Sequence, residues 1–296
     1  MALNTAMNNV IIKRKDSDNM YDEYPDLIYE GLVHDFEYVT ESSNKEGMMT
    51  KIKIFIKKLV NRIIVFFKKM KNKLTGKRDE DKYQSNSQGE NESVKDYLKR
   101  IHKRIMLPTY SFNQVEHFIT SECEKTLNEL LEKYSDLIYW MMIQYDKKNY
   151  KLITEYYNEE SEYKEYTEYC IKKIKNILID TDDLQLVTEE LYNNAFKMLK
   201  IMNNNHIDIV CNDTLVKLDK IDKEIERKKE KEKRRTDSEY IVYRQALSAM
   251  GGISYDTARV VKKYISEIDH MINDFNKIIS VVDITKSPYN HDGDEV

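Results

Sequence analysis

The residue types most often used for metal binding and nucleophilic chemistry are few: six histidines and three cysteines. Zinc sites, di-metal centres and redox dithiols place such residues close together, as in His-x-x-x-His, Glu-x-x-His or Cys-x-x-Cys arrangements. We expect none of these arrangements, and Cys123, Cys170 and Cys211 lie far apart in the sequence. We therefore expect buried thiols, no metal site and no cofactor.

Signatures of catalysis are also missing from the sequence. Seven glycines supply no glycine-rich phosphate loop, and neither "SSN" nor "SAM" is a nucleophile elbow. Neighbouring acids such as Glu159 and Glu160 are common in a charged helical sequence, so they do not indicate paired catalytic carboxylates. We expect no enzymatic activity, which leaves binding and structural roles.

The strongest candidate for a binding element is the basic stretch "KIKIFIKKLVNRIIVFFKKMKNKL" at residues 51–74. Its apolar residues recur at steps of three and four, the period of an α-helix with one apolar face. The basic residues fall mostly on the opposite side. The residues that we predict to bind a membrane or a partner are Ile52, Phe55, Ile56, Leu59, Ile63, Phe66, Phe67 and Met70, together with Lys57, Lys58, Arg62, Lys68 and Lys69.

Four interpretations of this helix remain open. Its apolar face could pack into a helical core, with the lysines merely solvated, or it could lie on an anionic membrane surface. It could also enter a groove on a partner protein or act as a nucleic-acid arm. The last is less favoured, because phosphate binding has no use for periodic apolar residues. The longest apolar run, residues 63–67, is too short to span a bilayer.

Two blocks of opposite charge adjoin at the start of this helix. Residues 16–46 contain ten acids and one lysine, whereas residues 47–78 contain eleven bases and no acid. We expect the acidic block to fold back on the basic helix and to lower its affinity for anionic surfaces. Glu41 and Glu46 are the candidate processing sites at which proteolysis would remove the acidic block.

The remaining sequence predicts an all-α protein, because glycine and proline are scarce while Lys, Glu, Ile, Leu and Tyr dominate. Residues 75–94 are polar and have little to bury, which is typical of a flexible linker. The predicted regions are an acidic, partly disordered segment (1–46), the basic amphipathic helix (47–74), the linker (75–94), a helical bundle (95–284) and a disordered tail (285–296).

Local signals predict how the bundle is divided. Pro108 should end its first helix, and a tyrosine-rich helix should occupy residues 147–179. Asp182 or Asp183 should cap the next helix. The "GG" at residues 251–252 should break the chain before the last amphipathic helix.

An acidic segment, then "GMMTKIKIFIKKLVNRIIVFFKKMKNKL", a polar linker and a helical region resemble the organisation of virion structural or head-interior proteins of large tailed phages of Firmicutes. About 30 of the 296 residues carry this resemblance. It implies a non-enzymatic structural or assembly protein of the virion or host cytoplasm, with other virion or assembly proteins and further copies of itself as partners.

Two other functions remain open. One is a membrane-active, host-directed effector in which the same helix perturbs a bilayer. The other is a nucleic-acid-binding structural protein that uses the basic runs at residues 51–78 and 226–235 together. A peripheral location at the inner face of the host membrane is also open.

Overall fold

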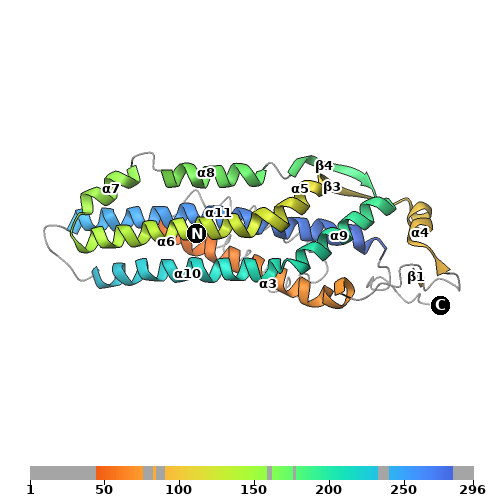
Figure 1. The fold of residues 1–296 in the computed structure, drawn as a ribbon, viewed down its shortest axis with the longest axis horizontal. Coiled ribbons are helices and arrows are strands. Elements are labelled where there is room, and N and C mark those ends of the chain that lie inside the picture. Colours follow the sequence, from red (N-terminus) through yellow and green to blue (C-terminus); the bar gives the residue numbers. More distant parts are fainter. Residues whose placement is uncertain are drawn as a thin grey trace, which may run out of the picture. The chain divides into compact units, whose positions relative to one another are not determined.

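The architecture is known from a computed structural model, which describes residues 45–75, 83–84, 91–158, 162–175, 178–232 and 240–282. It is predominantly helical, which confirms the predicted all-α class (Figure 1).

Met1–Met48 and Met49–Val296 form separate units, and the helical bundle belongs to the second unit. The predicted acidic segment up to residue 44, the predicted tail and most of the predicted linker lie outside the described residues. Glu41 is among the residues outside, and Glu46 lies at the start of the first described helix.

The described helices, in chain order, are α3 (Lys45–Thr75), α4 (Val94–Ile101), α5 (Phe112–His117), the π-helix η1 (Phe118–Glu122), α6 (Cys123–Asp146), α7 (Tyr150–Asn158), α8 (Glu162–Lys175), α9 (Glu189–Asn204), α10 (Ile207–Glu232) and α11 (Tyr240–Ser280).

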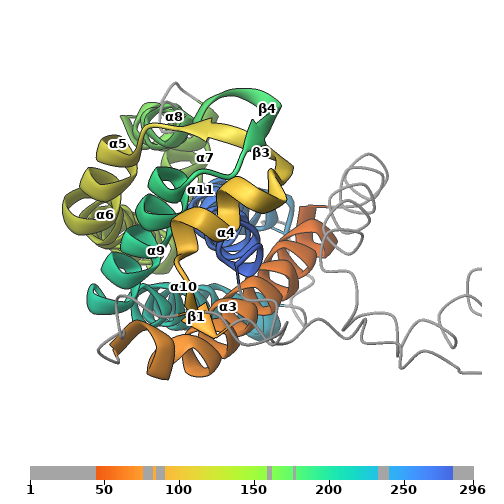
Figure 2. The same cartoon turned by 90° about the vertical axis from the view of Figure 1, so that its right-hand side faces the viewer.

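The long helix α11 lies at the centre of the packing. Helices α6, α7, α8, α9 and α10 all contact it, and Figure 2 shows it among them. Its apolar residues recur at helical spacing and almost all are buried, as an amphipathic helix inside a bundle requires. The largest of these buried side chains are Tyr243, Tyr264, Phe275, Ile265, Ile268 and Met271.

Within the described ranges, two short antiparallel pairs of strands interrupt the helices. Strand β1 (Tyr83–Gln84) pairs with β2 (Asn91–Glu92), inside the stretch predicted to be a linker. Strand β3 (Arg104–Tyr110) pairs with β4 (Leu178–Leu186), with an irregularity in register between Leu107 and Thr109. The residue at this irregularity is proline, which has no backbone N–H to donate to a strand ladder.

The prediction that a helix continues to Pro108 was wrong. Helix α4 ends at Ile101, where His102 adopts a left-handed backbone conformation with φ of 47°. The segment that follows is extended, and its partner strand β4 begins where the tyrosine-rich helix was predicted to end. That long helix is instead α7 and α8, followed by β4.

The predicted cap of the next helix was also wrong. Asp183 lies in β4, opposite Leu107. The residue that caps α9 is Thr188, whose hydroxyl oxygen accepts a hydrogen bond from the backbone N–H of Leu191 at 3.1 Å. Threonine competes well with aspartate at such positions because its oxygen reaches the same backbone donors.

The predicted break at the two glycines does not occur, because α11 runs straight through Gly251 and Gly252. A Cβ atom added to Gly252 would overlap the ring and hydroxyl of Tyr157 on α7. The glycine therefore permits the close approach of α7 to α11. Its low helix propensity is outweighed by this packing.

We predict opposite effects for alanine at the two glycines. Gly251→Ala should raise the free energy of unfolding by up to about 1 kcal/mol, because its Cβ meets only Lys229 Nζ, at 3.5 Å. Gly252→Ala should lower it by about 1–2 kcal/mol, because the Tyr157 ring must move. Urea denaturation of the two variants measures both effects, and stabilisation by Gly252→Ala would contradict the proposed packing role.

Candidate functional site

The apolar face of α3 is part of the bundle core. Seven of its eight predicted binding residues are buried, and Phe66 is partly exposed. Each fully buried aliphatic or aromatic side chain of this size contributes about 1.5–3 kcal/mol to folding. The structure thus corresponds to the core-packed interpretation, and insertion of this face into a membrane would require α3 to leave the bundle. The buried residues are Ile52, Phe55, Ile56, Leu59, Ile63, Phe67 and Met70.

The opposite face of α3 carries a row of exposed lysines, which we call the lysine ridge: Lys51, Lys57, Lys58, Lys68 and Lys69. None of the five pairs with an acid in the described part of the chain. Two aliphatic side chains, Ile54 and Val65, are 53% and 48% exposed on the same helix. The ridge is therefore a cationic surface with apolar residues between its charges.

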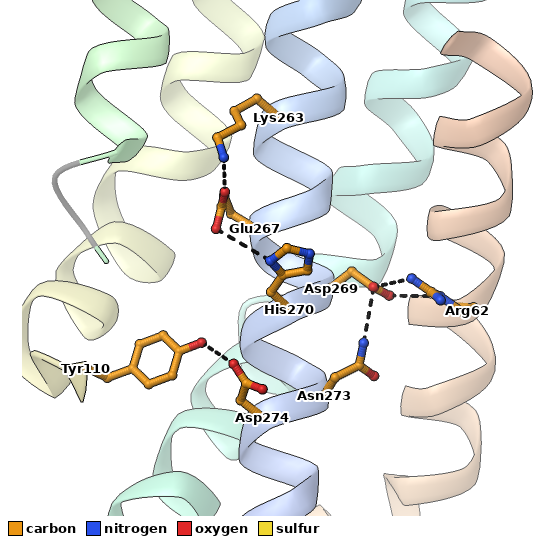
Figure 3. Close-up of polar contacts among 8 residues, drawn as sticks. All are labelled: Arg62, Tyr110, Lys263, Glu267, Asp269, His270, Asn273 and Asp274. Atoms are coloured by element: carbon orange, nitrogen blue, oxygen red, sulfur yellow. Dashed lines mark hydrogen bonds and ion pairs between the residues drawn. The ribbon is translucent and has the colours of Figure 1, made fainter. Parts of the chain in front are cut away.

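Arg62 differs from the other predicted basic residues because it pairs with a buried carboxylate. Its Nε donates to Asp269 Oδ1 of α11 at 3.2 Å, and its Nη2 contacts Oδ2 of the same group (Figure 3). Asn273 donates a further hydrogen bond to Oδ2 at 3.2 Å. Burial raises the pKa of Asp269 to about 6, although the Arg62 charge opposes the shift. The contact is bidentate, the strongest form of arginine–carboxylate pairing.

A second base of α3 reaches a second buried carboxylate. Lys53 Nζ lies 2.8 Å from Asp222 Oδ2 and 3.2 Å from Asp219 Oδ1, both on α10. Asp222 is only 3% exposed and also accepts hydrogen bonds from the hydroxyls of Tyr134 and Ser254. One carboxylate thereby connects α3, α6, α10 and α11.

These two contacts determine how α3 sits in the bundle. Lys53 holds one margin of its buried face to α10, and Arg62 holds the other margin to α11. Loss of either base would leave a buried carboxylate without its cation, which typically costs about 3–5 kcal/mol. The two ion pairs therefore fix the rotation of α3 about its own axis, and with it the direction in which the lysine ridge faces.

The prediction that no Glu-x-x-His arrangement occurs was wrong, because Glu267 and His270 of α11 form one. Glu267 is 2% exposed and pairs with Lys263, and His270 Nδ1 lies 3.9 Å from Glu267 Oε2 (Figure 3). Burial lowers the pKa of His270 to about 4. In the described ranges, no three His, Cys, Asp or Glu side chains converge on a common point, so this pair has no third ligand.

The three cysteines are buried and unbridged, which confirms the expected burial. Burial raises the pKa of the Cys123 thiol to about 12, so it stays protonated at neutral pH. A protonated, buried thiol is a poor nucleophile.

No family model, curated protein or solved structure compared with the chain matches it. Among the described helices, none combines the length and the apolar character needed to cross a lipid bilayer.

The Arg62–Asp269 pair should behave as a buried unit. We predict that Arg62→Met lowers the free energy of unfolding by about 3 kcal/mol, because Asp269 loses its cation. Arg62→Met combined with Asp269→Leu should recover most of this loss, since a buried ion pair can be replaced by apolar residues. Lys58→Met, on the exposed face, is the matched control. Chemical denaturation measures all three, and a double variant no more stable than Arg62→Met alone would contradict the coupling.

The pH dependence of stability should reveal Asp269 and His270 acting in opposite directions. Below pH 6.5 the unfolded chain protonates His270, but the folded chain does so only near pH 4, so acidification destabilises the fold. Asp269 is protonated near pH 6 in the folded chain and near pH 3.8 in the unfolded chain, so acidification stabilises it. Among the charged groups that face this pair are Arg62 of α3 and Glu267 and Lys277 of α11.

The two contributions can be separated by substitution. Relative to the parent protein, His270→Asn should gain roughly 2–3 kcal/mol of stability between pH 6.5 and pH 4. Relative to the parent protein, Asp269→Asn should instead lose stability as the pH falls from 6 to 4. Urea denaturation at several pH values gives these slopes, and identical slopes in the two variants would refute the assignment.

Proposed function

We propose that this chain is a non-enzymatic interaction protein that binds an anionic membrane surface through the lysine ridge of α3. The observation that supports this proposal is that five exposed lysines lie on one face of α3. None of them pairs with an acid in the described part of the chain. A row of cations along one helix that is held in the bundle is suited to an extended anionic surface.

The aliphatic residues within the ridge favour a membrane over a nucleic acid. Ile54 and Val65 are about half exposed and lie on the same helix as the lysines. Lipid headgroups accommodate both charged and apolar side chains, whereas phosphate-backbone binding uses the charges alone. Near an anionic leaflet each lysine contributes about 1 kcal/mol at best, and salt weakens the attraction.

Binding through the ridge leaves the bundle intact, and this separates the proposal from the effector alternative. An effector that inserted the apolar face of α3 would have to strip Lys53 from Asp222 and Arg62 from Asp269. Both carboxylates would then be left buried without cations. The proposed contact is therefore peripheral and reversible.

A structural role in a phage particle is compatible with such a surface, and its support is the sequence resemblance. In that role the ridge would hold the protein against the host membrane or against an acidic protein of the assembly.

The test is co-sedimentation of the full chain with vesicles of phosphatidylcholine alone or mixed with phosphatidylglycerol. We expect binding only to the anionic vesicles and weaker binding as salt rises. Lys57→Glu with Lys58→Glu should lower the affinity at least about tenfold. Lys172→Glu with Lys200→Glu makes the same charge change on exposed lysines of α8 and α9, and should retain near-parental affinity.

Three results would overturn the proposal. Equal losses in the two double variants would show that net charge, and not the ridge, controls binding. Retention of duplex DNA without vesicle binding would favour the nucleic-acid alternative. Vesicle binding accompanied by loss of amide protection throughout α3 would favour the membrane-active effector.

A further inference from the structure

A groove with a volume of about 580 Å³ lies between α6 and α10 and involves no residue of α3. Leu131 and Ile138 of α6 are buried at this groove, and Ile221 of α10 is partly exposed beside them. Met142 completes the apolar lining. The groove thus offers an apolar recess on a face that the proposed membrane contact does not use.

Large apolar side chains project from the same two helices. Tyr139 of α6 lines the groove and is 68% exposed, and Val216 and Ile209 of α10 are 58% and 52% exposed. Of these three, Tyr139 borders the recess, and tyrosine is enriched where proteins meet. The recess and the projecting Tyr139 at its margin together form one patch.

The rims of the groove carry opposite charges. Glu132 on α6 and Lys220 on α10 are both exposed, and neither has an oppositely charged partner among the described residues. Two other polar residues of the groove are already engaged. Lys217 Nζ donates to Asn128 at 2.8 Å, and Glu224 pairs with Arg227 at 2.6 Å.

We infer that this patch binds a second copy of the chain in a two-fold dimer. A two-fold interface uses the same patch on both copies, so it must be complementary to itself. This patch meets that condition, because it holds both a projecting Tyr139 and a recess, and both an acidic and a basic rim. In the dimer, Tyr139 of each copy occupies the groove of the other, and Glu132 faces the partner's Lys220 twice.

The first test is the oligomeric state of the full chain, measured by sedimentation equilibrium over a concentration series. We expect a monomer–dimer equilibrium. Tyr139→Glu should weaken dimerisation at least about tenfold, because it places charge in the apolar recess. Tyr169→Glu, at a tyrosine that is 57% exposed on α8, is the matched control and should leave the equilibrium unchanged.

The second test reverses the rim charges. Glu132→Lys and Lys220→Glu should each weaken homodimerisation, because each brings like charges together twice. An equimolar mixture of the two single variants should recover dimerisation, since every rim contact is then between opposite charges. Neither variant changes α3, so a loss of dimerisation can be distinguished from a loss of vesicle binding.

A chain that stays monomeric throughout the concentration series would overturn the inference. Dimerisation that is unaffected by Tyr139→Glu would overturn it as well, because the dimer would then use another surface. Failure of the mixed variants to recover would show that the rims do not face each other and would reject the two-fold arrangement.

Discussion

A carboxylate buried in a helical bundle needs a cation nearby, and two such carboxylates in this protein take theirs from α3. Asp269 of α11 pairs with Arg62, and Asp222 of α10 pairs with Lys53. The attraction between buried charges is offset by the cost of removing them from water, so the pairs need not add much stability. Their effect is on arrangement, because any rotation of α3 would leave both acids uncompensated.

The basic residues of α3 therefore serve two different purposes. Lys53 and Arg62, at the margins of the apolar face, neutralise the interior. The lysine ridge on the outer face has no acid to neutralise in the described part of the chain. Since the apolar face is occupied by the core, the energy available for binding an anionic surface is mainly electrostatic. Such binding is reversible and sensitive to salt.

The local features of α3 could be predicted from the sequence, whereas its partners could not. Apolar spacing indicated a helix over residues 47–74, close to the observed Lys45–Thr75, and an apolar face that is indeed continuous. Whether that face meets a membrane or the chain's own core depends on residues that are distant in the sequence, such as Asp269, which lies 207 residues away from Arg62. No local pattern carries that information.

The same limit explains the errors elsewhere in the bundle. Gly252 looks like a helix breaker until Tyr157 of α7 is placed beside it. The extended segment before Pro108 looks helical until β4 is available to pair with it.

The central claim, that the apolar face of α3 is part of the folded core, is tested most directly by native-state hydrogen exchange of the full chain. We predict that the amides of Ile56, Leu59 and Ile63 exchange only through global unfolding, at the same free energy as the central amides of α11. Exchange of those amides through local opening well below that free energy would contradict the account.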